Sequence, residues 1–446
     1  MHLPYFGETD VLSEIGGSLG DLGTLVPILV SMTVGGQANL TSSLVIGGLF
    51  NIISGVWFKI PMCVQPMKAI AAVALTTHLS ANQVATAGFT TSAVILLLSA
   101  TNLLTPIYRL CPLPLIRGIQ LGTGLSLVNK GISAILASGN FTQQHTSPQT
   151  TLKFWTDNYI IALLAFIAVL AMYPRKKLNF TAIVLVVYCL VVSLVAVYGL
   201  GGNGGGKEYQ VGPEFPNSFV WSNVTSEDFR VGFLNAGLGQ LPLTLLNSVF
   251  ATSKLADDLF PERSRPVASI TAVGVFVGFM NLIGVWFGSI PYCMGSGGLA
   301  GQYRFGARSH FSVIFLGTSK VLIGLLFGKL LLPVIQAFPG SVLGVMLVIS
   351  GVELASAMRD LTVTEASKLK DSPNGFLIAF VGGSVVVASG NDGIGFLVAS
   401  ITAFILWLHQ VNDDVEELRE ADVETKGLGS VAAARLVIHV KECFKK

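Results

Sequence analysis

The chain has 446 residues, of which 52% are hydrophobic and only 12% are charged, and its mean hydropathy is +0.68. Soluble domains carry roughly twice that charged fraction, so this composition excludes an ordinary soluble protein and predicts a membrane protein in a lipid bilayer. The net charge of +2 does not indicate any class of charged partner, and we expect no binding to nucleic acid.

A membrane-spanning helix needs ~20 apolar residues, and about fourteen such stretches follow one another along the chain. We predict these segments at 15–34, 39–58, 60–79, 84–101, 113–136, 156–173, 178–200, 231–253, 266–288, 291–307, 311–336, 338–357, 374–390 and 392–410. The fold class is therefore an all-α polytopic membrane protein.

Little of the chain remains outside these segments, which leaves no room for a nucleotide-binding domain and excludes ATP-driven pumping by this chain alone. No Cys or His spacing indicates a metal site, so we expect neither metal ligands nor a cofactor. We predict that Cys63, Cys189 and Cys293 are buried free thiols. An intramembrane aspartyl protease is disfavoured because the stretch around Asp21 lacks the G-x-G-D spacing. We expect no cleavable signal peptide.

Lys and Arg residues predict the orientation of the chain in the membrane. With both termini in the cytoplasm, most basic clusters also lie on that side, which agrees with the positive-inside rule. These clusters are Arg109 with Arg117, Arg175 to Lys177, Lys254 with Arg263 and Arg265, Arg304 with Arg308, and Arg359 with Lys368 and Lys370. We expect the plasma membrane in preference to a vacuolar or other internal membrane.

The sequence contains an internal repeat at a separation of about 230 residues. NIISGVWFKIPMC (51–63) matches NLIGVWFGSIPYC (281–293), and LGDLGTLVP (19–27) resembles LGQLPLTLLN (238–247). Each half holds seven predicted segments, and an odd number forces the second half to be inverted relative to the first. Two inverted seven-segment repeats are typical of secondary transporters, whose substrate sites lie between broken helices near the middle of the membrane.

Segments 3 and 10 are predicted to be broken into half-helices. In IPMCVQPMKAIAAVA (60–74), two prolines cannot lie in one continuous helix, so we expect an extended stretch and then a helix with Pro66 near its first position. In IPYCMGSGGLAGQYRFG (290–306), the run from Gly295 opens the helix with Ser296 as its cap. Two helix N-termini that face one another form an anion site, because each carries roughly half a positive charge.

The predicted anion ligands are the polar groups around these breaks. Lys68 adds a full positive charge, although a snorkelling lysine or an ion pair with Asp21 is the alternative. Asn247 and Thr244 are candidate donors to the anion, with helix packing as the alternative. The full predicted substrate set is Gln65, Lys68, Ser296, Gly297, Gly298, Asn247, Thr244 and Gln240.

Two acids fall within apolar segments, where a carboxylate is expensive and usually functional. Asp21 is either a proton-coupling carboxylate or a scaffold acceptor, and it aligns with the neutral Gln240 of the second half. Glu353 in segment 12 is predicted to have a structural or gating role.

Four long strings carry a resemblance to a known family: GDLGTLVP (20–27), PMCVQPMKAIAAVA (61–74), QLPLTLLNSVFATSKLADDLFPER (240–263) and GGLAGQYRFGARS (297–309). With these strings the chain closely resembles the eukaryotic molybdate transporters, relatives of the SulP sulfate permeases. The resemblance implies molybdate transport through the fourteen-segment fold shared with uracil permease. It also implies that segments 1–4 and 8–11 form a core that holds the ligand, bordered by a gate of the other segments. The chain departs from the family pattern at Cys63 and at Met294, where we expect Pro and His.

The resemblance divides the chain into seven parts. They are a cytoplasmic N-terminus (1–14), the core (15–101 and 231–336), the gate (102–200 and 337–410), an extracytoplasmic loop (201–230) and a cytoplasmic tail (411–446). That tail is too short for the STAS domain of sulfate permeases.

The predicted function is alternating-access transport of molybdate, with the anion held between the half-helices of segments 3 and 10. The alternatives are transport of sulfate, tungstate or another small anion, and a nutrient receptor that does not transport. A homodimer is left open.

Overall fold

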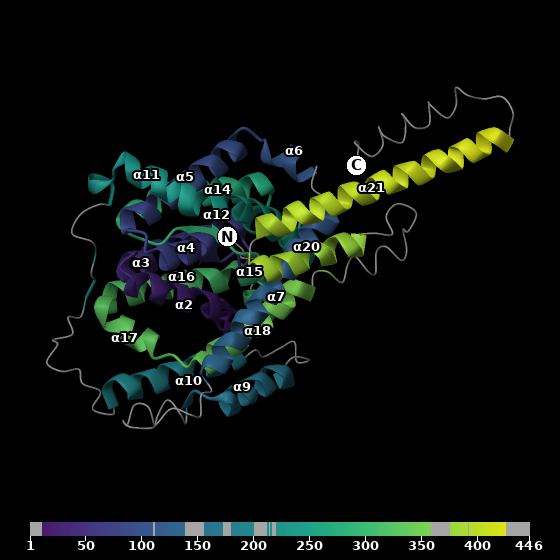
Figure 1. Ribbon diagram of the computed structural model, residues 1–446. Coiled ribbons are helices and arrows are strands. Elements are labelled where there is room, and N and C mark those ends of the chain that lie inside the picture. Colours follow the sequence, from purple (N-terminus) through teal and green to yellow (C-terminus); the bar gives the residue numbers. More distant parts are fainter. Residues whose placement is uncertain are drawn as a thin grey trace.

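The structure is a computed structural model that describes residues 11–109, 112–138, 156–172, 180–199, 212–213, 215, 220–356, 358, 375–390 and 392–424. Helices account for nearly all of this part of the chain, which confirms the all-α prediction (Figure 1). The strands in the described ranges are two three-residue segments that pair with each other.

The first half begins with a helix that is interrupted near its middle. Segment 1 consists of α1 (Val11–Ser18), a 3-10 turn η1 (Leu19–Asp21) and α2 (Leu22–Val34). The remaining elements are α3 (Leu40–Phe58), β1 (Val64–Pro66), α4 (Lys68–Thr77), α5 (Ala81–Ala100), α6 (Leu104–Arg109), α7 (Leu113–Ser138), α9 (Tyr159–Met172), α10 (Phe180–Leu194) and the π-helix η2 (Val195–Gly199).

The second half follows the same order. Short helices η3 (Val220–Asn223) and α11 (Ser226–Gly232) lead into segment 8, which alternates between π and α geometry: η4 (Phe233–Gly237), α12 (Leu238–Leu243), η5 (Thr244–Ala251) and α13 (Thr252–Leu259). Then come α14 (Ile270–Gly284), η6 (Val285–Phe287), β2 (Tyr292–Met294), α15 (Ser296–Arg304), α16 (His310–Phe327), η7 (Gly328–Leu330), α17 (Leu331–Gln336), α18 (Gly340–Ser356), α20 (Gly375–Ser389) and α21 (Asp392–Glu424).

Each of the fourteen predicted segments contains helix, and segments 3 and 10 are the half-helices α4 and α15. By length and composition, five helical stretches in the described ranges can cross a membrane: 11–34, 40–58, 81–100, 270–287 and 310–327. The largest boundary difference is at the C-terminal end. There α21 continues past residue 410 to Glu424 and projects beyond the other helices (Figure 1).

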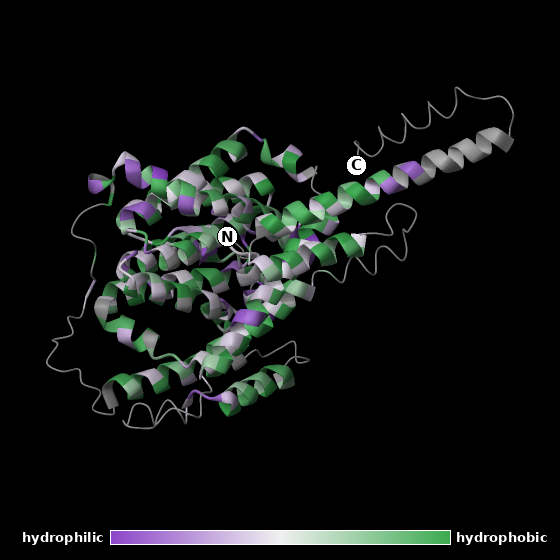
Figure 2. Cartoon of the chain, viewed as in Figure 1, coloured by the Kyte–Doolittle hydropathy of each residue, from purple (hydrophilic) through white to green (hydrophobic). Residues whose placement is uncertain are grey.

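Apolar side chains cover the outer surface of many helices, as expected for a protein surrounded by lipid (Figure 2). Exposed examples are Leu163 on α9, Val184 on α10 and Phe404 on α21. Hydrophilic residues gather on α11 instead, where Glu227 and Arg230 form an exposed ion pair (Figure 2). An integral membrane protein accounts for this distribution.

The two halves are joined at the centre by the pairing of β1 with β2. The strands are antiparallel, and Gln65 lies opposite Cys293. Two equivalent buried asparagines hold them: Asn51 of α3 accepts a hydrogen bond from the Val64 amide at 2.7 Å, and Asn281 of α14 accepts one from the Tyr292 amide at 2.6 Å. These asparagines begin the two copies of the sequence repeat, so the repeat preserves the support of both half-helices.

Paired glycines also bring helices of the two halves together. A Cβ at Gly124 of α7 would lie 2.6 Å from the Gly351 carbonyl oxygen of α18, and a Cβ at Gly351 would lie 2.5 Å from the Gly124 carbonyl oxygen. Since any larger residue would overlap the facing backbone, the glycines set the separation of α7 and α18. Gly48 of α3 and Gly317 of α16 play the same part at a second crossing.

Candidate functional site

The half-helix α4 begins two residues later than its sequence predicts. Pro66 belongs to β1, and the Met67 amide donates to the Pro291 carbonyl oxygen at 2.8 Å, which extends the pairing of the two strands. Met67 is therefore an extended N-cap, and the helix starts at Lys68. The expectation that Pro66 lies near the first helical position is wrong, because strand pairing holds the backbone extended there.

Gln65 is fully buried and joins β1 to segment 1. Its amide nitrogen donates to the carboxylate of Asp21 and, at 2.9 Å, to the hydroxyl of Thr24. Thr24 itself donates to Oδ1 of Asp21 at 2.8 Å. Asp21 lies at the end of the 3-10 turn η1, so the interruption of segment 1 brings the carboxylate to the half-helices.

The half-helix α15 begins at Ser296, and its N-cap is Gly295. The expectation that Ser296 caps this helix is therefore wrong. The side chain of Gln65 occupies the space where a Cβ of Gly295 would lie, and a Cβ at Gly298 would overlap Cys63 and lie 2.5 Å from Nε2 of Gln65. These two glycines are needed because residues of the other half-helix pass directly over the first turn of α15.

Ser296 and Asn247 contact each other, since the Ser296 hydroxyl donates to the side-chain oxygen of Asn247. Asn247 lies in the π-helix η5, where the wider turn follows Pro242 of α12. Single π turns within α-helices are frequent at functional sites. The side-chain amide of Asn247 in segment 8 therefore lies at the first turn of α15.

Gln240 has a different partner from the one predicted. Its side-chain oxygen accepts hydrogen bonds from the backbone amides of Ala69 and Ile70, at 2.9 and 3.3 Å, and its amide nitrogen donates to Thr244 at 3.0 Å. Gln240 therefore caps α4 from segment 8. Direct contact of Gln240 or Thr244 with an anion stays a prediction.

Lys68 is partly buried, but its ammonium nitrogen is shielded from solvent and has no hydrogen-bond partner among the described residues. Lys68 is the first residue of α4 and follows the extended N-cap Met67, so the helix begins directly beyond β1. The Lys68 ammonium makes no direct ion pair with Asp21. An ammonium in these surroundings can attract an anion at the start of α4.

Gly297 faces the close crossing of α7 and α18. A Cβ at this glycine would lie 2.9 Å from Cδ1 of Leu127 and 3.8 Å from Cδ2 of Leu354. Both leucines are buried, and they occupy equivalent positions in the two repeats. An apolar pair thus borders the first turn of α15 opposite the polar groups.

The structure brings seven of the predicted residues into three groups. The first joins Asp21, Gln65 and Gly298, the second joins Gln240 and Thr244 at the start of α4, and the third joins Ser296 and Asn247. Glu353 is part of α18, but its side chain lies outside the described residues.

One buried lysine was not predicted. Lys320 lies in the middle of α16, and it is 5% exposed. The signal was present in the sequence, because a lysine within the apolar run FSVIFLGTSKVLIGLLF (311–327) is costly in a membrane.

The groups around the half-helices carry positive charge or donate hydrogen bonds. In the described part of the chain, no group of three or more His, Cys, Asp or Glu side chains is arranged to hold a metal ion. Cys63, Cys189 and Cys293 are buried free thiols, as predicted. The available groups are an ammonium, a hydroxyl, side-chain amides and the first-turn amides of α15.

Solved anion transporters share this fold. The chain aligns with a structure of SLC26A9 at a TM-score of 0.56 and 15% identity, covering 90% of this chain and 66% of that one. It aligns with the transmembrane domain of the cyanobacterial bicarbonate transporter BicA at a TM-score of 0.52 and 14% identity, covering 89% of this chain and 98% of that domain. The two inverted seven-segment repeats of these structures are thus the fold of this chain.

Sequence comparison identifies the family. Molybdate transporter 2 of Arabidopsis thaliana is 35% identical over 95% of this chain and 93% of its own length, and molybdate transporter 1 of the same plant is 31% identical over 89% and 88%. Molybdate transporter 1 of Chlamydomonas reinhardtii is 33% identical over 87% and 90%. Residues 13–127 and 232–354 match the family described as "Molybdate transporter of MFS superfamily". The chain belongs to this family of transporters and is not an enzyme.

Proposed function

We propose that the chain is a secondary transporter that carries molybdate by alternating access, with the anion held where α4 and α15 begin. The observation that carries this proposal is the pairing of β1 with β2, which brings together the starts of α4 and α15. The first has the unpartnered ammonium of Lys68, and the second has a glycine-rich first turn. The names of the relatives support molybdate as the substrate.

The donors at this place favour a tetrahedral oxyanion. The amides that precede the first α15 hydrogen bond, from Leu299 to Gly295, are neutral donors at fixed positions. The Ser296 hydroxyl and the Gln65 amide already donate to Asn247 and to Asp21 and Thr24, so they hold this place rigid. Molybdate is larger than sulfate and carries the same charge, so rigid neutral donors can separate the two by size. Purified protein that binds sulfate as tightly as molybdate would contradict this account of selectivity.

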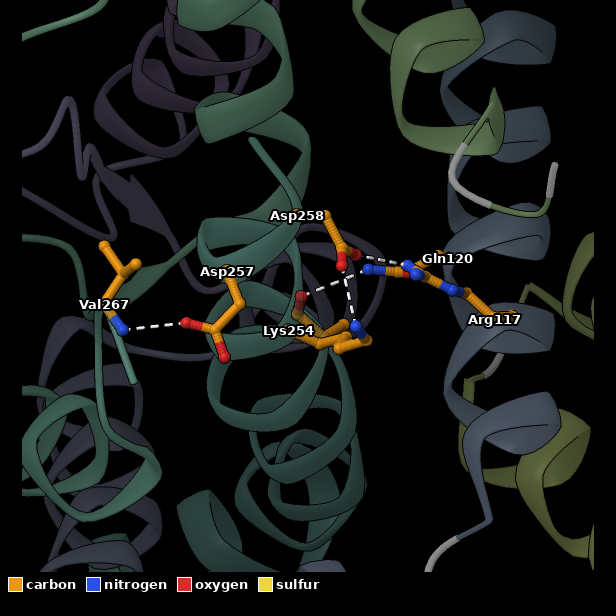
Figure 3. A network of polar contacts seen from close by, with 7 residues as sticks. Arg117, Gln120, Lys254, Asp257, Asp258 and Val267 are labelled. Atoms are coloured by element: carbon orange, nitrogen blue, oxygen red, sulfur yellow. Dashed lines mark hydrogen bonds and ion pairs between the residues drawn. The ribbon is translucent and has the colours of Figure 1, made fainter. Parts of the chain in front are cut away.

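Transport requires the proposed core and gate to move against one another, and one polar network crosses between them (Figure 3). Arg117 of α7, 1% exposed, pairs with Asp258 of α13 at 2.8 Å, and Lys254 donates to the same carboxylate at 2.7 Å. Gln120 accepts from Arg117 at 2.9 Å and donates to the Ala251 carbonyl oxygen at 3.1 Å. We propose that these contacts hold one end of the path closed and break when the core moves.

The test of the function is molybdate uptake into lipid vesicles that contain the purified protein, measured by mass spectrometry, with protein-free vesicles as the control. Uptake above the control, inhibited by tungstate more than by chloride, supports the proposal. Molybdate binding by the purified protein without uptake would instead favour the receptor.

The test of the network compares a buried with an exposed ion pair. Arg117→Ala and Asp258→Asn should lower uptake at least about fivefold while the molybdate Kd changes less than about twofold, because the pair acts on movement and not on the anion. Arg230→Ala removes the exposed pair with Glu227 and should leave both quantities unchanged. Equal losses of binding and uptake in Arg117→Ala and Asp258→Asn would place the network in the binding site.

We also propose that both termini are cytoplasmic, on the distribution of Lys and Arg between the loops. The plasma membrane stays a prediction. Protease accessibility of tags at the two ends of the protein in intact cells tests the orientation. Cleavage of either tag from outside would contradict it. A homodimer stays a prediction, and the mass of the detergent-solubilised protein tests it.

A further inference from the structure

Glu14 of α1 is a buried acid with no role in the site as described so far. It is 2% exposed, and its Oε1 accepts hydrogen bonds from the backbone amides of Arg308 and Ser309, at 2.9 and 3.0 Å. Its other oxygen, Oε2, has no hydrogen-bond partner among the described residues. The two amides belong to the linker between α15 and α16, so Glu14 ties segment 1 to the chain that directly follows the half-helix α15.

The face of segment 1 that carries Glu14 continues along α15. Three residues further on, a Cβ at Gly17 would overlap the backbone nitrogen of Ala307. After three more residues, a Cβ at Gly20 would lie 2.7 Å from the Gly301 carbonyl oxygen. Because residues three apart lie on one side of a helix, these contacts form a single line. Segment 1 thus runs antiparallel to α15, with the two backbones in direct contact.

Segment 1 also holds the opposite end of α15, through Asp21 and Gln65. Gln65 donates to the carboxylate of Asp21, and its side chain occupies the space where a Cβ of Gly295 would lie, at the N-cap of α15. The helix has nine residues, and isolated helices shorter than about 12–15 residues are marginal, so its position depends on tertiary contacts. Segment 1 supplies such contacts at both of its ends.

We propose that Glu14 is a positioning residue of the anion site, which holds the linker after α15 and so keeps the first-turn amides of this half-helix in place beside Gln65. This role rests on the proposed function, because those amides are taken to bind the anion. Glu14 lies at the far end of α15 and acts through the helix. The role requires an acceptor at Oε1 and no charge, since a carboxyl group protonated at Oε2 still accepts from the same two amides.

Asp157 offers a matched control in the proposed gate. It is 6% exposed, and its carboxylate also accepts from two successive backbone amides of another segment. These are the amides of Gly340 and Ser341 at the start of α18, at 3.1 and 2.8 Å. Removal of either carboxylate therefore breaks two hydrogen bonds of the same kind, but Glu14 lies on the segment that runs along α15, whereas Asp157 precedes α9.

The experiment measures molybdate binding by calorimetry on the purified full-length protein, together with thermal unfolding, for the wild type, Glu14→Ala, Glu14→Gln and Asp157→Ala. Glu14→Ala should raise the molybdate Kd roughly tenfold with an unchanged number of sites per protein, because the donors of a site must be held within a fraction of an ångström. Glu14→Gln should stay within about threefold of wild type, since its amide oxygen accepts from the same amides. Asp157→Ala should lower the melting temperature as Glu14→Ala does, but leave the Kd within about twofold of wild type.

The outcomes separate this role from the proposed function. Wild-type protein that binds no molybdate overturns the proposed function, and the role of Glu14 with it. Wild-type binding with an unchanged Kd in Glu14→Ala overturns the role alone, even if fewer sites remain, because a merely structural residue changes the amount of folded protein and not its affinity.

Two further results would contradict the role of Glu14. An equal rise in Kd in Asp157→Ala would mean that any loosening of the fold weakens binding. Glu14→Gln that binds as poorly as Glu14→Ala would mean that the charge of Glu14 matters and not its hydrogen bonds. If Glu14→Ala does not fold, Glu14→Asp takes its place under the same criteria, because a side chain shorter by one methylene draws the acceptor away from both amides.

Discussion

The two half-helices occupy equivalent places in the inverted repeat, but their first turns have different partners. In α4, the amides of Ala69 and Ile70 donate to Gln240 of segment 8. In α15, no side chain among the described residues accepts from the first-turn amides, and the residues there are Ser296, Gly297 and Gly298. We therefore expect the two half-helices to contribute differently to the proposed site: α4 supplies the ammonium of Lys68, and α15 supplies backbone amides of its first turn.

The same contrast holds for the two residues that align in segments 1 and 8. The carboxylate of Asp21 accepts a hydrogen bond from Gln65 of β1, whereas its counterpart Gln240 accepts from a backbone amide at the start of α4. A carboxylate in the place of Gln240 would add a second negative charge beside the anion. A neutral amide satisfies the same backbone donors without that repulsion, which explains why the halves differ here.

The largest expected effect comes from adding a side chain to the tightly packed first turn of α15. Gly298→Ala places a Cβ against Cys63 and the side chain of Gln65, so the strand or the helix must shift. We expect the molybdate Kd to rise roughly hundredfold, because overpacking of about 1–3 kcal/mol is added to the loss of aligned donors. Calorimetry on the purified protein measures this change.

The matched control for that variant is Gly239→Ala in α12, where a Cβ would meet nothing within 4 Å. It should bind molybdate as the wild type does. Unchanged binding in Gly298→Ala would mean that the first turn of α15 is not the anion site.

Removal of the charge from α4 should have the next largest effect. Lys68→Ala should raise the molybdate Kd roughly twentyfold with little change in thermal stability, because the ammonium has no protein hydrogen bond to lose. Lys68→Arg keeps the charge and should recover part of the affinity. Wild-type affinity in Lys68→Ala would move the anion away from α4.

The smallest effect on molybdate binding is expected at Gln240, because this side chain already accepts hydrogen bonds from the first-turn amides of α4. Gln240→Ala leaves the amides of Ala69 and Ile70 without their acceptor, so thermal unfolding should show a loss of about 1–2 kcal/mol in stability. The molybdate Kd should stay within about threefold of wild type. A tenfold weaker binding, with stability unchanged, would show that Gln240 serves the anion and not α4.

The repeat and the half-helices could be predicted from the sequence, because both depend on local patterns. The copies that begin at Asn51 and Asn281 place the two breaks, and the prolines and glycines between them exclude continuous helices. Gln65, Lys68, Ser296 and Gly298 were all selected on that basis, and the structure places them around the breaks.

The contacts between segments could not be predicted in the same way. The partners of Gln240 depend on how segment 8 packs on segment 3. Ala69, for example, lies 171 residues from Gln240 in the sequence, and no local periodicity indicates that the two meet. Arg117 was assigned to a cytoplasmic cluster because charge alone was considered, whereas its ion pair with Asp258 allows it to be buried. The first residues of the half-helices were misplaced for a related reason, since the pairing of β1 with β2 decides where each helix starts.

The pairing of β1 with β2 has a consequence for the direction in which the anion is carried. Main-chain hydrogen bonds between these strands join the half-helix of one repeat to that of the other. We therefore expect the donors of the proposed site to move together. Under the proposed mechanism, the anion meets the same coordination geometry from either face of the membrane, and the gradients across the membrane set the direction of net movement.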